Sequence, residues 1–160
     1  MPPVASIPAT ALIDALVDEG TFSAWTPSDL QVRDDFAPDA DEYSRQLQTA
    51  RADTGRSESV VVGEARIGGI RTAVIVGDFD FLAGSVGRQA CQLVIAALER
   101  ARELRLPTFA SPSSGGTRMQ EGTRAFVLMA DVAASVHRFR GAGNLMIVWL
   151  RNPTTGGVMA

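Results

Sequence analysis

Two residue types that carry much protein chemistry are almost missing from this 160-residue sequence, which has one cysteine, Cys91, and one histidine, His137. A single cysteine excludes an internal disulfide and any zinc site with several cysteine ligands. A single histidine excludes a metal centre with several histidine ligands, and a Ser-His-Asp triad is left with His137 alone. We therefore expect no metal in this chain, a thiol packed in the core at Cys91, and a structural or surface role for His137.

The sequence also lacks an excess of positive charge and a long apolar run. Its 15 Lys and Arg residues against 18 Asp and Glu residues give a net charge of −3 at pH 7, which provides no basic field for nucleic acid. No apolar run approaches the roughly 18 residues of a membrane span, and residues 1–10 lack the basic and apolar regions of a secretory signal. With 46% hydrophobic and 21% charged residues, the composition predicts a cytoplasmic globular protein that binds neither nucleic acid nor a membrane.

What the sequence does contain begins with a helical and connecting segment over residues 1–57. Thr10 as a hydroxyl cap and Gly20 as a stop predict a short helix between them. Residues 21–40 are rich in Pro, Asp and Ser and predict a connector. The helices expected in this segment span residues 11–19 and 42–52.

From residue 58 to residue 160 the pattern changes to strands rich in β-branched residues that alternate with helices. This order is typical of a layered α/β fold. The second of the long helices is apolar on almost every side, so we expect it to be buried within this chain or against another. The predicted elements are strands at 59–67 and 70–81, a helix at 88–106, a strand at 108–111, a helix at 118–140 and a strand at 144–150.

Two glycine pairs stand directly after predicted strands, Gly115-Gly116 before the long helix and Gly156-Gly157 after the last strand. Without a Cβ, glycine lets a ligand approach the backbone, and N–H groups at a helix start suit a developing oxyanion. Two such loops together are able to polarise a thioester carbonyl and hold an enolate. Glycine also occurs at strand-to-helix turns for geometry alone, so both interpretations stay open here. Neither pair is a phosphate loop, because no Gly-Lys-Ser/Thr follows and G-x-G-x-x-G is absent.

One pair of acids invites a second interpretation. Asp78 and Asp80 alternate around Phe79, which places both carboxylates on one face of the predicted strand. Such a pair suits acid–base catalysis. It equally suits a solvent-facing pair or a loop anchor, and the alternatives stay open.

Three stretches of the sequence resemble the carboxyltransferase β subunits of acetyl-CoA carboxylase. SSGGTRMQEG (residues 113–122) resembles the SGGARMQE loop of that family, NPTTGGV (152–158) is similar to DPTTGGV, and FDFLAGSVG (79–87) is similar to FSFMGGSMG. IDALVDEGTF and VVVGEARIGGI follow the same family pattern, so the resemblance covers nearly the whole chain. It implies a crotonase-like (ClpP/crotonase) fold of ββα units, with residues 58–160 as the N-terminal part of that domain.

The resemblance also implies an activity. The chain would bind acyl-CoA and transfer a carboxyl group from carboxybiotin, held on a biotin carboxyl carrier protein, to acetyl-CoA or a similar acyl-CoA, giving malonyl-CoA. The partner would be an α-type carboxyltransferase chain or the remaining half of the fold. The backbone N–H groups of Gly115, Gly116, Gly156 and Gly157 would stabilise the enolate, and biotin itself would take the proton. The substrate contacts implied are Ala83, Gly84, Ser85, Ser114, Thr117, Arg118 and Thr155.

The chain departs from the family pattern at several points. The N-terminal zinc ribbon of many β subunits is absent, Ala83 replaces a usual glycine, and Arg88-Gln89-Ala90 replaces a small, glycine-containing helix start. Family members continue well beyond Gly157, so we expect the rest of the fold in another chain or in a longer protein. Two further functions stay open: a crotonase-type decarboxylase of malonyl thioesters that uses no biotin, and a non-catalytic assembly fragment.

Overall fold

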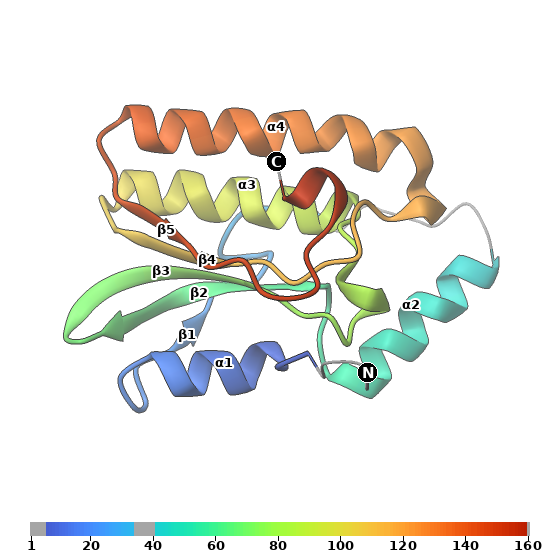
Figure 1. The fold of residues 1–160 in the computed structure, drawn as a ribbon, viewed down its shortest axis with the longest axis horizontal. Coiled ribbons are helices and arrows are strands. Elements are labelled where there is room, and N and C mark those ends of the chain that lie inside the picture. Colours follow the sequence, from blue (N-terminus) through green and yellow to red (C-terminus); the bar gives the residue numbers. More distant parts are fainter. Residues whose placement is uncertain (1–5, 34–40, 160) are drawn as a thin grey trace.

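The computed structural model describes residues 6–33 and 41–159. It is a three-layer arrangement in which two long helices cover one face of a sheet and a short helix covers the other (Figure 1). The helices are α1 (Ala9–Leu16), α2 (Asp41–Thr54), α3 (Arg88–Glu103) and α4 (Gly122–Gly141). The strands are β1 (Ser23–Ala24), β2 (Val60–Ile67), β3 (Ile70–Gly77), β4 (Thr108–Ser111) and β5 (Met146–Val148). Short 3-10 turns lie at η1 (Leu82–Gly84), η2 (Met119–Glu121) and η3 (Gly156–Val158).

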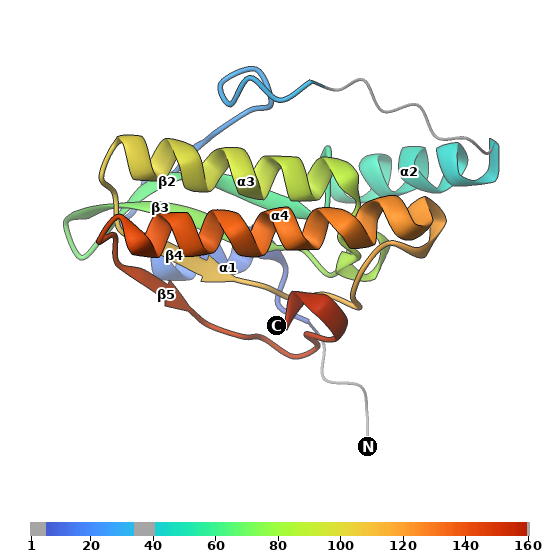
Figure 2. The ribbon, with the colours of Figure 1, turned by 90° about the horizontal axis from the view of Figure 1, so that it is seen from above.

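The strands lie in the order β1-β2-β3-β4-β5, so each is paired with its neighbours in the sequence. The first three are antiparallel, and β3, β4 and β5 are parallel. Each parallel connection runs through a helix, α3 and then α4, which lie side by side when the molecule is seen from above (Figure 2). This α/β architecture confirms the predicted fold class. Because the three parallel strands end at one edge of the sheet, the loops that follow them meet there.

The core forms because β3 is apolar on both faces. Ala73 and Ile75 face α3, where they pack with Ala97 and Leu98. Val74 and Val76 face the other side and pack against α1. A strand buried on both faces is expected where helices cover both sides of a sheet.

The glycine turn predicted between the first two long strands is confirmed. Gly68 and Gly69 join β2 to β3 with φ angles of 59° and 81°, which glycine adopts without strain. The Asp18 carboxylate accepts both of their N–H groups, at 3.0 and 2.7 Å. An acid that follows α1 thus fixes the hairpin that α1 covers.

The N-terminal segment joins the same body. Besides the packing of α1, strand β1 pairs with β2, a strand that the connector prediction for residues 21–40 missed; residues 34–40 of that connector lie outside the described residues. The helix predicted at 42–52 is present as α2. The boundary between residues 57 and 58 stays a prediction.

Several predicted element boundaries are wrong, including the end of α3 at Glu103 instead of residue 106 and the extent of β5, Met146–Val148 instead of 144–150. Helix α1 begins one residue before Thr10, with Pro8 at its cap and no side-chain cap. The strand expected at 70–81 ends at Gly77, because the chain turns there into η1. The long helix begins at Gly122 rather than at Arg118, whose side chain is buried below the preceding loop.

Helix α4 is not enclosed within this chain. Ala125, Ser135 and Phe139 are its buried residues, whereas Phe126 and Val127 are 65% and 59% exposed. The helix is therefore not buried by the described residues of this chain. Its burial against another chain, the second possibility that the sequence suggested, stays a prediction. Across the described part of the chain, no helix is both long enough and apolar enough to cross a membrane.

Candidate active site

Three loops meet at the carboxyl ends of the parallel strands. They follow β3, β4 and β5 and lie on the side of the sheet next to α2 (Figure 1). They contain all of the site residues predicted from the sequence. The loops of interest here are the β3 loop (residues 78–87), the SSGG loop (112–118) and the TTGG loop (152–158).

Main-chain hydrogen bonds join the SSGG loop to the TTGG loop. The Ser114 N–H donates to the Pro153 carbonyl at 2.8 Å, and the Thr155 N–H donates to the Ser114 carbonyl at 3.0 Å. The glycines then come close together, since a Cβ built on Gly156 would lie 3.6 Å from the Gly116 Cα. The structure thus brings together the two glycine pairs that are 41 positions apart in the sequence.

The β3 loop is joined to the SSGG loop in the same way. The Gly115 N–H donates to the Ala83 carbonyl at 2.9 Å, and the Val86 N–H donates to the Gly116 carbonyl at 2.9 Å. A short parallel bridge between Val86 and Thr117 continues the contact. Ala83, Gly84 and the SSGG loop therefore form one continuous wall.

The two glycine pairs differ in what their N–H groups do. The Gly115 N–H is bonded to Ala83, and the Gly116 N–H is bonded to the Ser114 hydroxyl at 3.0 Å. Gly156 and Gly157 open the turn η3, where the first N–H groups have no partner within the turn. Among the described residues no acceptor is found for either of them. The two pairs look alike in sequence, whereas among the described residues only the second pair has N–H groups without an acceptor.

Close backbone contacts explain two other glycines, Gly84 in the wall and Gly77 at the end of β3. A Cβ on Gly84 would lie 2.2 Å from the Ser113 carbonyl oxygen, and one on Gly77 would lie 2.8 Å from the Ser113 nitrogen. Neither position accepts a side chain without moving the SSGG loop. Ala83 stands in the left-handed region, with φ 53°, a conformation that costs a non-glycine residue about 1–2 kcal/mol. The residue that departs from the family pattern thus occupies a backbone conformation suited to glycine.

Arg118, expected at the substrate, is a buried support of the wall. Its side chain is 1% exposed and forms an ion pair with Glu58, Nη1 to Oε2 at 2.9 Å. Its Nη2 and Nε also donate to the carbonyl and hydroxyl oxygens of Ser85, at 2.7 and 3.2 Å. Burial opposes the charge, but the hydrogen bonds and charge of Glu58 outweigh it and raise the pKa of Arg118. The guanidinium is enclosed by these protein partners.

The support includes two more residues that sequence reasoning missed. Tyr43, from α2, donates its hydroxyl to Glu121, and Glu121 also accepts the N–H of Arg88 at the start of α3. Burial, together with the hydrogen bond to Glu121, raises the pKa of Tyr43 above its ordinary value. Glu121 lies inside the RMQEG motif, but the sequence does not indicate its contact with Tyr43. Nor does it indicate the contact of Arg118 with Glu58, because the two contacts join residues 78 and 60 positions apart.

A cavity of about 480 Å³ opens below the three loops. Gly84, Ser113, Ser114 and Gly157 lie at the loop end of the cavity. Its walls are mainly apolar and include Val94, Leu98, Val136 and Met146. A pocket of this size and character suits a small organic ligand.

The other side chains considered from the sequence have structural roles. Asp78 is buried and paired with Arg56 at 2.9 Å, and it accepts the N–H of Asp80, so this acid anchors the β3 loop. Cys91 is fully buried, and burial raises its pKa to about 12, as expected of a core thiol. His137 is exposed on α4, as expected. No group of three metal-binding side chains occurs in the residues that the structure describes.

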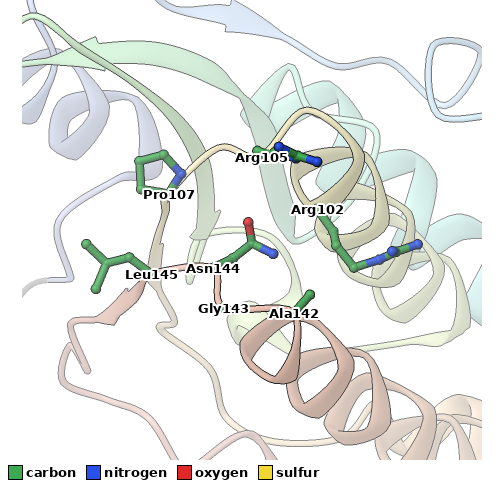
Figure 3. A pocket seen from close by; sticks show the side chains of 7 residues that line it. All are labelled: Arg102, Arg105, Pro107, Ala142, Gly143, Asn144 and Leu145. Carbon is green, nitrogen blue, oxygen red and sulfur yellow. The ribbon is translucent and has the colours of Figure 1, made fainter.

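A second hollow, of about 610 Å³, lies at the other end of the sheet (Figure 3). Arg102 lines it from the last turn of α3, Arg105 from the turn that follows, and residues 142–145 from the turn after α4. Pro107, directly before β4, also lines it, so this hollow lies at the amino ends of the parallel strands. It is separate from the three loops.

The carboxyl transferase domain family matches residues 16–159, nearly the whole chain. The chain belongs to this family. A probable biotin-dependent acyl-coenzyme A carboxylase beta3 subunit of Mycobacterium tuberculosis is 51% identical over 146 residues, which are 91% of this chain and 28% of the relative. An acetyl-coenzyme A carboxylase carboxyl transferase subunit beta of Fusobacterium nucleatum is 38% identical, over 92% of this chain and 48% of the relative. The chain thus spans between about a quarter and a half of these relatives.

Solved structures of a transcarboxylase and of a malonate decarboxylase have the same crotonase-like fold. Transcarboxylase 12S superposes with a TM-score of 0.74 at 20% identity, covering 95% of this chain and 27% of that one. A Pseudomonas malonate decarboxylase heterodimer superposes with a TM-score of 0.64 at 18% identity, covering 89% of this chain and 51% of that one. The resemblance of the SSGG and TTGG motifs to carboxyltransferases is therefore confirmed at the level of family and fold.

Proposed function

We propose that this carboxyl transferase domain is the acyl-CoA-binding, β-type component of a biotin-dependent carboxyltransferase. It acts on acetyl-CoA or a similar acyl-CoA and gives malonyl-CoA or its homologue. One observation carries the proposal: the N–H groups of Gly156 and Gly157 have no acceptor among the described residues. In the neighbouring SSGG loop, by contrast, both glycine N–H groups are hydrogen-bonded within the protein. Family membership supports the same reaction class.

These two N–H groups would bind the thioester carbonyl oxygen as it gains negative charge. Because the loops are held by main-chain hydrogen bonds, the donors need no rearrangement when the charge develops. In the wall opposite these donors, Gly84 and Gly116 present backbone without a side chain. Loss of one such donor typically lowers kcat by about 10²–10³.

None of the described residues that line the cavity below the loops is an acid or a histidine. Within the described residues, the buried acids around the loops, Glu58 and Asp78, are ion-paired to arginines. Glu121 accepts hydrogen bonds from Tyr43 and Arg88. This fits a reaction in which the protein supplies dipoles and the proton acceptor arrives with the second substrate. Carboxybiotin on a separate carrier protein would supply both the carboxyl group and, after its release, that acceptor.

The substrate contacts divide into two groups under this proposal. Gly156, Gly157 and Thr155 face the acyl thioester, with Ala83, Gly84, Gly116 and Thr117 in the wall. Ser85, Ser114, Gly115 and Arg118 act indirectly, because their polar groups bind one another, their own loop or the neighbouring loop. This proposal revises the equal roles that the sequence predicts for the four glycines and replaces the direct contacts predicted for Ser85, Ser114 and Arg118.

A partner is part of the proposal. Besides the exposed Phe126 and Val127 of α4, the β5 region exposes Ile147, Val148 and Trp149 by 54%, 51% and 48%. Large apolar side chains exposed in this number are typical of an interface. We infer an α-type chain, or the remaining half of the fold, as the partner that carries the biotin site.

The alternative is decarboxylation of a malonyl thioester without biotin, since a malonate decarboxylase shares the fold. The same two donors would then stabilise the same enolate. Incubation with malonyl-CoA and biocytin, with and without an α-type partner, separates the two. Release of acetyl-CoA that depends on biocytin supports the carboxyltransferase, and release without biocytin supports the decarboxylase. If no acetyl-CoA is released in any combination, a non-catalytic assembly role is the better account.

A further inference from the structure

A second buried arginine, Arg151, lies between the ends of the strands that carry the loops. It is 7% exposed. Its Nε donates to the Ser111 hydroxyl at 3.0 Å, and its Nη1 donates to the Ile7 carbonyl at 2.7 Å. Its Nη2 donates to the carbonyls of Gly77 and, at 3.2 Å, Ser111. One guanidinium therefore holds the end of β3, the end of β4 and the segment before α1.

Arg151 differs from Arg118 in having no carboxylate partner. No acid of the described residues lies within ion-pair distance of it, and nearby Asp78 is already paired with Arg56. Burial lowers the pKa of Arg151, and the charge of Asp78 opposes this only in part. Burying a cation without a counter-charge is unfavourable. The four carbonyl and hydroxyl contacts thus replace an ion pair, and only the planar fork of arginine reaches all of them.

The backbone of the same residue opens the TTGG loop. The Arg151 N–H donates to the Pro112 carbonyl at 3.1 Å, and the Thr154 hydroxyl donates to the Arg151 carbonyl at 2.6 Å. Pro112 is the residue that opens the SSGG loop. Arg151 thus contacts β3 and β4 through its side chain and both glycine loops through its main chain.

We propose that Arg151 is a positioning residue that sets the distance between the Gly156-Gly157 donors and the SSGG wall. It does so by locking the TTGG loop to the ends of β3 and β4. The proposal rests on the proposed function, because it assigns Arg151 to the same oxyanion site. A displacement of about 1 Å at such a site is enough to lower the rate about 10²-fold.

The test compares three variants in the complete active preparation. R151K keeps the positive charge and loses the fork. S111A removes the hydroxyl that accepts from Nε and donates to the Trp149 carbonyl, and it decides the matter if R151K does not fold. R71K is the matched control, since Arg71 forms an exposed pair with Glu64 on the hairpin.

We expect R151K to lower kcat for biocytin-dependent acetyl-CoA release by about 10²-fold, while KM for malonyl-CoA stays near the wild-type value. S111A should lower kcat less, and R71K should not change it. All are measured at a temperature where thermal unfolding curves show the variants folded. An unchanged kcat in the folded variants, or a rise in KM alone, would overturn the proposal.

A second readout needs no activity and keeps the inference separate from the proposed function. In ¹H–¹⁵N spectra of the 160-residue chain, the amide signals of Gly156 and Gly157 should move in R151K and S111A and stay in place in R71K. If wild type is inactive and these signals still move, the proposed function fails and the positioning role of Arg151 stands. If the signals stay in place in folded R151K and S111A, Arg151 does not position the donors.

Discussion

The SSGG and TTGG loops look alike in sequence, and the molecule holds them in different ways. In the SSGG loop both glycine N–H groups are bonded, to Ala83 and to Ser114, and the ion pair of Arg118 and Glu58 lies beneath it. In the TTGG loop no acceptor is found for the glycine N–H groups among the described residues, and the supporting cation, Arg151, has no carboxylate partner. We interpret this as a difference in role. The SSGG loop, whose polar groups are satisfied, acts with the residues beneath it as a rigid frame, whereas the TTGG loop has unsatisfied N–H donors that are able to bind a negative charge.

Removal of the acid under the SSGG loop should have the largest effect on stability. Glu58→Ala leaves the buried Arg118 without a counter-charge, so the free energy of unfolding should fall by about 3–5 kcal/mol. Urea unfolding measures it. The double variant E58L/R118M, which removes both charges, should recover much of the loss; a double variant as unstable as Glu58→Ala would show that packing, rather than the ion pair, holds the frame.

Removal of a donor from the TTGG loop should have the largest effect on turnover. Gly157→Pro deletes an N–H group, so kcat should fall by about 10²–10³ while acyl-CoA binding is largely kept. Gly157→Ala is the matched control, because its Cβ meets only the Met129 Cγ at 3.9 Å and the N–H stays. Equal losses in both variants would point to crowding of the turn instead of a lost donor.

The single tyrosine gives a spectroscopic probe of the frame. Burial and Glu121 raise the pKa of Tyr43 above its ordinary value near 10. The folded state therefore favours the neutral phenol, and the stability that this provides is complete below pH 10 and is lost as pH rises above it. Absorbance at 295 nm should rise only as the protein unfolds, and Tyr43→Phe should weaken the alkaline loss of stability. Ionisation in the folded protein near pH 10 would contradict the buried network.

The smallest effect is expected for the hydroxyl inside the SSGG loop. Ser114→Ala removes the acceptor of the Gly116 N–H, so the free energy of unfolding should fall by about 0.5–1.5 kcal/mol. Turnover should stay close to wild type, since this N–H belongs to the frame. A loss of kcat as large as that of Gly157→Pro would make the SSGG loop a donor site as well and remove the distinction between the loops.

The fold class and the glycine pairs of the candidate site could be read from the sequence because both depend on local patterns. The β-branched runs, the Gly68-Gly69 turn and the glycine pairs after strands are readable in sequence order. The residue at which α4 begins was harder to predict. Arg118 has good helix propensity, but its pairing with Glu58 draws it inward, and the helix starts four residues later at Gly122.

The difference in hydrogen bonding between the two loops could not be predicted from the sequence. Whether Gly115 has a free N–H depends on the position of the Ala83 carbonyl, thirty-two residues away and in a left-handed turn. Likewise, Arg151 follows a run of apolar residues and carries no motif. Its role arises only where β3, β4 and the TTGG loop converge.

The most direct test of the difference between the loops is a titration of the ¹⁵N-labelled protein with acetyl-CoA. The amide signals of Gly156 and Gly157 should shift progressively as the thioester carbonyl accepts their hydrogen bonds, while those of Gly115 and Gly116 change little. Equal shifts in both pairs, or shifts confined to Gly115 and Gly116, would contradict the assignment of the oxyanion donors to the TTGG loop.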